Sequence, residues 1–251
     1  MGFQLSSDVD YRANVLDHGF VQLRNLSGPT RRPHQEFDAH DVDPPNAARM
    51  SFDQMDTGRT EDEDHRLAKY LMKNWHTSPF EMIEAWIEMK LPILVARQFV
   101  RHRTVSLNEV SARYVTLPAE WYIPALADVK FQVGDKKQGG RLIDMTNPEE
   151  VEKGMNFQAN LDRQCAASYA LYLSSIQDGI ANEQARTFLH VNHYTHWLWK
   201  QDFHNILNFL SLRDHSHAQG EATYYARAID GLLRAQLPKS MMLYDEYRRR
   251  L

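Results

Sequence analysis

The sequence predicts an α+β protein whose residues 1–251 form a single domain. Two observations support this prediction. Some segments carry an apolar residue at every second position and others at every third or fourth position, and these are the periods of strands and helices. In addition, neither an internal repeat nor a linker divides the 251 residues, and a chain of this length can bury a substantial core.

The first predicted strand covers residues 19–26, where the side chains of the segment alternate between two faces. Residues 27–46 follow with four prolines among charged residues, which favours a variable loop. Residues 46–52 predict a short helix that runs into a turn. The acidic and polar residues 53–64 predict a second, solvated loop, and residues 65–75 place their apolar side chains at helical spacing.

Residues 80–90 predict a core strand, because every second side chain from Ile83 to Met89 is apolar. Pro92 suits the first turn of a helix, and we expect that helix to end just before Arg101. Residues 114–124 are aromatic and extended in character.

The second half of the chain opens with a predicted hairpin or variable loop at residues 128–146, which contain two glycine-bearing turn signals. Asn147 and Pro148 predict a helix start, because asparagine caps helix N-termini and proline suits the first helical position. Helical spacing continues to Ile176, and we expect Gly179 to end the helix.

Four more elements are predicted before the end of the chain. Residues 182–189 favour a helix, and the aromatic residues 194–200 favour a strand. Residues 203–212 predict a helix with one apolar and one polar side. A last helix is expected at residues 222–233 and should end before Pro238.

The composition argues against several classes of protein. The formal net charge is −4, whereas a general nucleic-acid binder needs a basic surface. Residues 1–18 lack the basic and apolar regions of a signal peptide. No run of about twenty apolar residues is present for a membrane span. We therefore expect no nucleic-acid or membrane partner and a cytoplasmic location.

The cysteine and histidine content bears on disulfides and metals. Cys165 is the only cysteine, so an internal disulfide is excluded, and its place in an apolar helical series favours a small buried thiol. His190, His193 and His196 recur every third residue. The aromatic character of this stretch favours a strand, on which His193 points away from the other two. No HExxH pattern supports catalytic zinc, and we expect no metal.

Two common enzyme signatures are missing from the chain. Ser106 and Ser111 lie near His102 in the sequence, but no GxSxG elbow surrounds either serine. No GxGxxG or Walker-type sequence appears. A nucleotide would therefore have to be bound through side-chain donors.

Residues 101–114 form the most unusual polar segment, with three arginines and a histidine in fourteen residues. Glu109 is the only acid between positions 91 and 119. An exposed, charge-laced helix would normally carry balancing acids, so we favour a local site for phosphate or carboxylate, which the arginine fork grips in a bidentate manner. Glu109 is either the internal partner of these donors or an acceptor for a ligand N–H.

The spacing RHRxxSxNExSxRY in this segment resembles the signature of flavin-dependent thymidylate synthases. Further segments resemble that family in its order: residues 19–21, 47–52, 76–81, 96–98 and 212–219. The resemblance spans most of residues 15–230.

The resemblance implies an α+β protomer with helices around a central, mostly antiparallel sheet, and a homotetramer with active sites at subunit interfaces. It implies the reductive methylation of dUMP to dTMP. In that reaction 5,10-methylenetetrahydrofolate gives the carbon, and FAD that has been reduced by NADPH gives the hydride. The family needs no cysteine nucleophile, which agrees with a buried Cys165.

The resemblance also implies site residues, position by position. Contact with dUMP is expected from Gln98, Arg101, Glu109, Ser111, Ala112, Arg113, Arg186 and Arg213. Contact with FAD is expected from Ser51, Ser78, Glu81, Arg101, His102, Arg103, Glu109, His204, Asn208 and His217. Arg213 is the expected catalytic residue, because it matches an arginine thought to polarise the uracil ring, and a fixed charge stabilises a developing anion. His76 is expected on the folate and NADPH side.

The chain departs from the family pattern in two places. Many members carry Asn-x-Arg where this chain has Asp202-Phe203-His204, and a histidine is not a permanent cation. Residues 27–45 also exceed the family's minimal form.

Two other functions are open from the residues alone. The first is a module that binds nucleotides in a cradle of arginines without turnover, and the second is a His-rich metallohydrolase. A yellow protein whose reduced flavin is oxidised in the presence of dUMP would distinguish the enzyme from both, and metal analysis tests the hydrolase.

Overall fold

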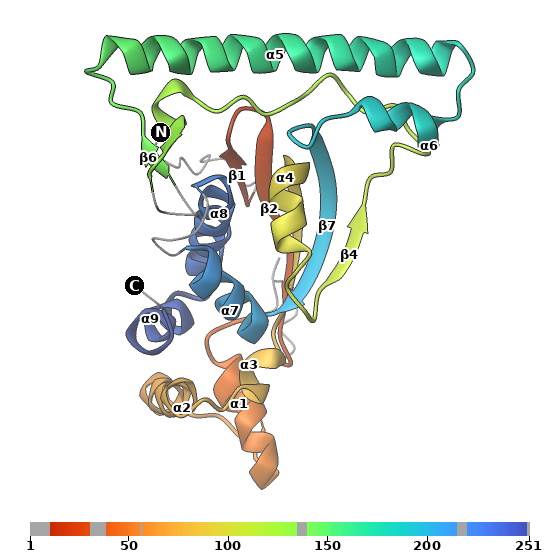
Figure 1. Cartoon of the computed structure of the whole chain (residues 1–251). Coiled ribbons are helices and arrows are strands. Elements are labelled where there is room, and N and C mark those ends of the chain that lie inside the picture. The colour runs from red at the N-terminus through yellow and green to blue at the C-terminus, as the bar shows by residue number, and fades with distance from the viewer. Residues whose placement is uncertain (1–10, 31–38, 56, 135–139, 215–219, 250–251) are drawn as a thin grey trace.

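The centre of the protein is a five-stranded antiparallel sheet with the strand order β1-β2-β3-β7-β4 (Figure 1). This computed structural model describes residues 11–30, 39–55, 57–134, 140–214 and 220–249. The strands are β1 (Arg12–Val15), β2 (Gly19–Ser27), β3 (Glu84–Pro92), β4 (Ser106–Glu109) and β7 (Tyr194–Asp202). The structure thereby confirms the predicted α+β class.

Strands β3 and β7 pair along their whole length, with Met89 opposite Trp197. Alternation places Ala85, Ile87 and Met89 in the core on one face of β3. The predicted strands at 19–26 and 194–200 are confirmed. The strand predicted from residue 80 begins four residues later, at Glu84, because residues 78–81 form the short helix α3 (Ser78–Glu81) with a proline at its start.

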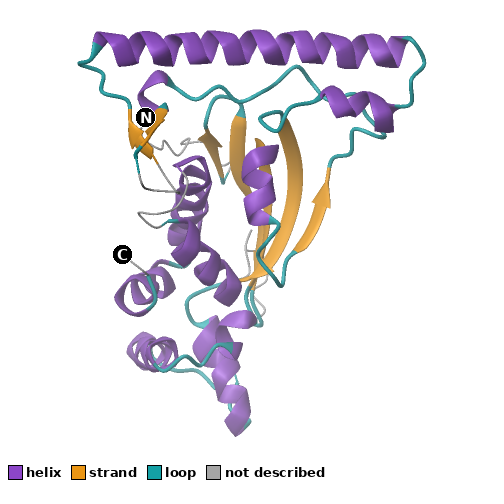
Figure 2. Cartoon of the chain, viewed as in Figure 1, coloured by secondary structure: helices purple, strands orange, loops and turns teal. Residues whose placement is uncertain are grey.

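Three helices surround one aromatic core beside the sheet: α4 (Ile93–Phe99), α7 (Phe203–Arg213) and α8 (Gly220–Gln236). Helix α8 packs on β1 and β2, and α7 packs on β7 (Figure 2). Phe209 of α7 meets Phe99 edge-on, with ring centroids 4.8 Å apart, and lies 5.3 Å from the Trp199 ring of β7. These buried rings fix the end of α4 against α7, and therefore the position of the arginine-rich residues that follow α4.

A second group of helices lies beyond the end of the sheet: α1 (Asp43–Arg49), the 3-10 helix η1 (Met50–Phe52), α2 (Glu61–Lys73) and α3 (Figure 1). Helix α9 (Pro238–Tyr247) packs against both α2 and α8. Two predicted loops were too long. Helix α1 begins at Asp43 with prolines in its first turn. Helix α2 begins at Glu61, because Thr60 and Glu63 form a reciprocal capping box. Helix α9 was not predicted.

Helix α5 (Pro148–Gln177) spans 30 residues and crosses one end of the molecule (Figure 1). Its predicted start is confirmed, since the Asn147 side chain accepts hydrogen bonds from the Glu149 and Glu150 amides. Gly179, at φ +83°, ends it as predicted. Every residue of this helix is described, and only Gly154, Cys165, Ser168 and Tyr172 are buried. Most side chains of α5 are therefore exposed or only half-buried against the other described residues.

The remaining elements are small. The predicted hairpin is confirmed by β5 (Lys130–Gln132) and β6 (Gly140–Leu142), which pair antiparallel after the 3-10 helix η2 (Leu126–Asp128). The helix predicted at residues 182–189 consists of α6 (Asn182–Ala185) and the 3-10 helix η3 (Arg186–Phe188). Within the described residues, no helix has the length and apolar character to span a membrane.

Candidate functional site

The turn that carries the arginine-rich segment is held by β7. Helix α4 ends at Phe99 as predicted, and residues 101–104 form a turn in which Thr104 adopts φ +66°. The buried Gln201 amide on β7 donates hydrogen bonds to the Arg103 carbonyl, at 3.0 Å, and to the Thr104 hydroxyl, at 3.3 Å. A polar side chain inside the sheet thus fixes a backbone with an unfavourable φ.

Strand β4 places the second half of this segment on the sheet, with Glu109 opposite Trp197 of β7. The buried Thr195 hydroxyl donates a 2.5 Å hydrogen bond to the Glu109 carboxylate. Among the described residues, no arginine pairs with Glu109. Its carboxylate keeps acceptor capacity for a ligand donor, since an ionised carboxylate has about four lone-pair sites.

Arg213, the last residue of α7, turns back onto the arginine-rich turn. Its Nε donates to His102 Nε2 at 2.9 Å, and its Nη2 donates to the Gln98 carbonyl at 3.0 Å. His102 also meets the Phe209 ring edge-on, with the centroids 4.9 Å apart. Three residues predicted for one site therefore touch, although Arg213 is more than 100 positions from the other two in the sequence.

The protonation of His102 agrees with this contact. Burial, together with the positive charge of Arg213, lowers the pKa of His102 to about 4. At neutral pH the imidazole is therefore uncharged, and its Nε2 is an acceptor for the guanidinium. Burial also lowers the pKa of Arg213, but an arginine remains a cation at pH 7.

Burial lowers the pKa of His193 to about 4, as it does for His102. We therefore expect the free energy of unfolding to fall as the pH drops from about 6.5 towards 4. In this window the unfolded chain takes up protons on these two imidazoles and the folded chain does not, so acid favours unfolding. The stabilising effect is complete above pH 6.5. Urea-unfolding midpoints at intervals from pH 7.5 to 4.5 measure the loss.

The matched test replaces one imidazole at a time. His193→Asn should give a shallower decline across this window, whereas His18→Gln, at an exposed position, should leave the slope unchanged. A His193→Asn slope equal to that of the wild type would contradict the assignment.

Ser111 and Arg113 form a second part of the site. The Ser111 hydroxyl accepts from both the backbone N and the Nε of Arg113, each at 3.3 Å, and the guanidinium lies 4.9 Å from the Tyr114 ring centroid. Ala112 between them is buried. The Asn182 amide of α6 donates to the Arg113 carbonyl at 3.4 Å, so α6 and the nearby Arg186 lie next to this segment.

The third part lies around α3 and the first turns of α7. The His204 ring and the Asn208 amide are hydrogen-bonded at 3.1 Å, and α3, with Ser78 and Glu81, packs against α7. Burial, with a contribution from the charge of Arg248, lowers the pKa of His204. Asp202, where the chain departs from the family pattern, has a structural role: its carboxylate caps α7 by accepting a 2.9 Å hydrogen bond from the backbone N–H of Asn205.

The remaining predicted residues are less connected. Arg101, Arg103 and Arg186 are exposed, and their guanidiniums form no ion pair with another described residue. Ser51 lies exposed in η1. The exposed His76 stacks on Tyr70 with ring centroids 5.6 Å apart. His217 lies outside the described residues. Unpaired guanidiniums on an acidic protein agree with the anion site predicted from the sequence.

Sequence reasoning missed Thr195, Gln201 and Asn182. A signal for the first two was present, because they share the parity of Trp197 and Trp199 on β7, and a polar residue on a buried face is informative. Asn182 gave no signal. In the part of the chain that the structure describes, no group of three or more potential ligands is placed to hold a metal ion.

Comparison with known proteins identifies the family. The family model described as "Thymidylate synthase complementing protein" matches residues 38–239. A flavin-dependent thymidylate synthase of Wolbachia pipientis wMel is 38% identical over 234 residues, which cover 93% of this chain and 76% of the relative. One of Gluconobacter oxydans is 37% identical and covers 93% of this chain and 72% of the relative.

Solved structures agree with these relatives. A UMP/dUMP methylase of Streptomyces cacaoi bound with 5-Br dUMP superposes with a TM-score of 0.78 at 26% identity, covering 94% of this chain and 98% of that protein. The same methylase bound with 5-Br UMP gives a TM-score of 0.76 at 25% identity. From the match over residues 38–239 and the identity to these relatives, the chain belongs to the family of flavin-dependent thymidylate synthases.

Proposed function

We propose that this protein is a flavin-dependent thymidylate synthase that converts dUMP to dTMP, with 5,10-methylenetetrahydrofolate as the carbon donor and NADPH as the reductant. The family membership supports the reaction, and the bromo-dUMP bound by the methylase supports the substrate. The observation that carries the proposal is the half-buried Arg213 guanidinium, held by His102 and the Gln98 carbonyl beside the arginine-rich segment.

In this proposal dUMP lies between the end of α7 and the segment from α4 to Tyr114. The exposed guanidiniums of Arg101, Arg113 and Arg186 suit a phosphate, which binds arginine in a bidentate manner. The residues assigned to dUMP are Gln98, Arg101, Glu109, Ser111, Ala112, Arg113, Arg186 and Arg213. Arg213 stabilises negative charge that develops on the uracil ring, since it is already fixed and partly removed from water.

The residues present fit FAD. Arg101 and Arg103 offer unpaired guanidiniums for a diphosphate, and the His204–Asn208 pair offers an amide and an imidazole for a heterocycle. When bound and reduced, FAD supplies the hydride. The residues assigned to it are Ser51, Ser78, Glu81, Arg101, His102, Arg103, Glu109, His204, Asn208 and His217. His76, exposed and stacked on Tyr70, is assigned to the folate and NADPH side.

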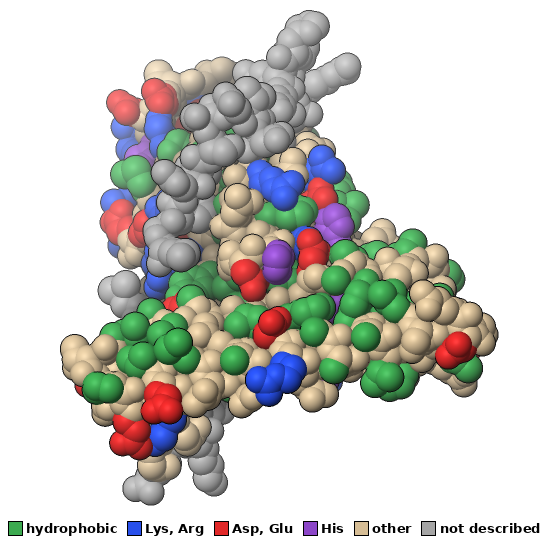
Figure 3. Space-filling view, turned by 90° about the horizontal axis from the view of Figure 1, so that it is seen from above, with side chains coloured by type: hydrophobic (Ala, Val, Ile, Leu, Met, Phe, Trp, Pro, Cys, Tyr) green, Lys and Arg blue, Asp and Glu red, His purple; other side chains and the backbone are tan. Residues whose placement is uncertain are grey.

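A homotetramer, with active sites at subunit interfaces, is part of the proposal. Helix α5 supports it, because Met155, Phe157 and Leu171 are exposed along a helix that has few buried residues. Seen from above, apolar side chains are spread along this helix (Figure 3). Exposed apolar side chains along one helix are typical of a protein interface, and a second copy of α5 is the partner assigned to it in this proposal. The single domain and the cytoplasmic location stay predictions.

The decisive experiment uses the purified chain. The protein should be yellow or take up added FAD, and its NADPH-reduced flavin should be reoxidised in the presence of dUMP and methylenetetrahydrofolate, with formation of dTMP. A chain that binds dUMP and FAD but forms no dTMP would instead be a non-catalytic nucleotide-binding module.

A further inference from the structure

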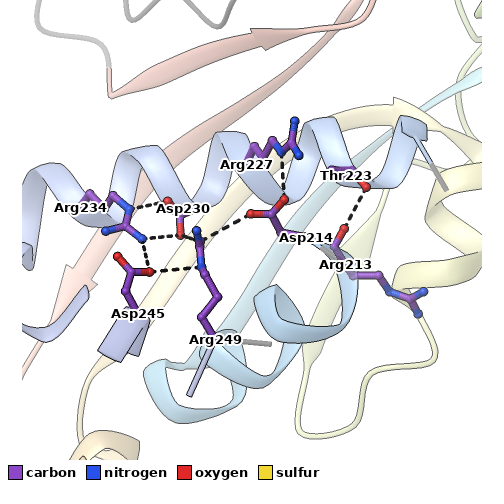
Figure 4. Close-up of polar contacts among 8 residues, drawn as sticks. All are labelled: Arg213, Asp214, Thr223, Arg227, Asp230, Arg234, Asp245 and Arg249. Atoms are coloured by element: carbon purple, nitrogen blue, oxygen red, sulfur yellow. Dashed lines mark hydrogen bonds and ion pairs between the residues drawn. The ribbon is translucent and has the colours of Figure 1, made fainter. Parts of the chain in front are cut away.

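A network of ion pairs lies directly behind Arg213 (Figure 4). Asp214 follows Arg213 at the end of α7, and its carboxylate accepts a 2.9 Å hydrogen bond from Nε of Arg227 on α8. The other oxygen of the same carboxylate lies 3.5 Å from Nη2 of Arg249. Figure 4 shows the Arg249 guanidinium between Asp214, Asp230 and Asp245. Arg249 therefore links the end of α7 to α8 and α9.

Arg249 is itself held firmly. Its guanidinium pairs with the buried Asp230, and its Nε lies 3.2 Å from the Asp245 carboxylate. The preceding residue, Arg248, is buried: its Nε donates to the Met72 carbonyl at 3.1 Å, and its guanidinium carbon lies 3.7 Å from the Trp75 ring centroid. The side chains of Arg248 and Arg249, which follow α9, are thus both held in place.

The ion-pair network is connected to Arg213 through the backbone of residues 213 and 214. The Arg213 carbonyl accepts a 3.0 Å hydrogen bond from the Thr223 hydroxyl, and the next residue is the Asp214 that Arg227 and Arg249 hold. On its other side, the Arg213 guanidinium is bound by His102 and Gln98. The hydrogen bonds to His102 and Gln98 orient the Arg213 guanidinium, while the contacts of the Arg213 carbonyl and of Asp214 fix the position of the Arg213 backbone.

We propose that Arg249 is a positioning residue for Arg213, which it holds in place by pairing with Asp214. This proposal rests on the proposed function of Arg213. Arg249 lies beyond the residues 38–239 that the family model matches, so the motif comparison does not point to it. The Asp214 side chain is 13% exposed and that of Arg249 22%, so this pair is less screened by water than a surface ion pair.

The test compares two arginines of the same network. Arg249→Ala removes the pair with Asp214, whereas Arg234→Ala removes pairs with Asp230 and Asp245 but none with Asp214. We expect kcat for dTMP formation to fall about 10- to 100-fold in Arg249→Ala, as a displacement of about 1 Å does at a catalytic group. Arg234→Ala should keep the wild-type kcat. Arg249→Lys should recover part of the loss, and the flavin spectrum should be unchanged in all three.

A double-mutant cycle separates positioning from general stability. If Arg249 acts through Asp214, Asp214→Asn should lower kcat by a similar factor, and the double variant should be no worse than either single variant. Additive losses, or an Arg249→Ala kcat equal to that of Arg234→Ala, would overturn the proposal. If the wild-type protein forms no dTMP, the proposed function fails instead. Should Arg249→Ala not fold, Asp214→Asn and Arg249→Lys carry the same comparison.

Discussion

Replacing Arg213 with alanine should lower kcat for dTMP formation about 100- to 1000-fold, the range found when one preorganised donor to a developing anion is removed. The guanidinium is partly buried and bound by His102 and Gln98, so water that fills the space cannot reproduce its fixed charge. FAD should remain bound, because Arg213 is not among the residues assigned to it. Steady-state kcat and the visible spectrum of the purified variant measure both outcomes.

Two further variants sharpen this test. Arg213→Lys keeps the charge but not the planar fork, and it should lie between the wild type and alanine. Arg141→Ala is the control, because Arg141 is an exposed arginine whose partner is Glu150 at the start of α5. An alanine variant with wild-type kcat would refute the role of Arg213.

If the protein is the proposed homotetramer, the double substitution Phe157→Asp and Leu171→Asp should convert it into smaller species and abolish turnover. Helix α5 is about 45 Å long at 1.5 Å per residue, and its Phe157 and Leu171 side chains are both exposed. In the proposed tetramer, a second copy of α5 covers them. Two buried, unpaired carboxylates in such an interface would be strongly unfavourable. Light scattering gives the mass, and a dTMP assay gives the activity.

The matched control for this interface is Asn156→Asp, which adds a carboxylate to the same helix at a polar, exposed position. It should keep both the assembly and the activity. A wild-type chain that runs at its own 29.3 kDa would contradict the proposed tetramer.

Elements with a strong local signal were predictable from the sequence. Strand β3 alternates strictly, and α5 carries Asn147 and Pro148 at its start and Gly179 just beyond its end. Strand β4 was missed because it has four mostly exposed residues, and pairing with β7 rather than its own pattern makes it a strand. Thr60 and Glu63 have the spacing of a capping box, which is a signal for the start of α2. It was missed because the acidic residues of this segment were interpreted as a loop.

The site was predictable as a set of residues but not as an arrangement. The arginine surplus of residues 101–114 indicated an anion site, and the family resemblance added Arg213. Nothing in the sequence indicates that Arg213 Nε lies 2.9 Å from His102, because that contact depends on how Phe209 packs between α4 and β7. Long-range packing of this kind has no periodic signature.

The passage from β7 into α7 has a consequence for insertions and deletions. Asp202 is both the last residue of β7 and the cap of α7, so no loop separates the strand that holds Gln201 from the helix that ends at Arg213. One inserted residue in this 11-residue helix would turn Arg213 by about 100° around the helix axis and advance it by about 1.5 Å. The number of residues in α7 is therefore as constrained as the identity of the arginine at its end, and related chains should vary there in composition but keep its length.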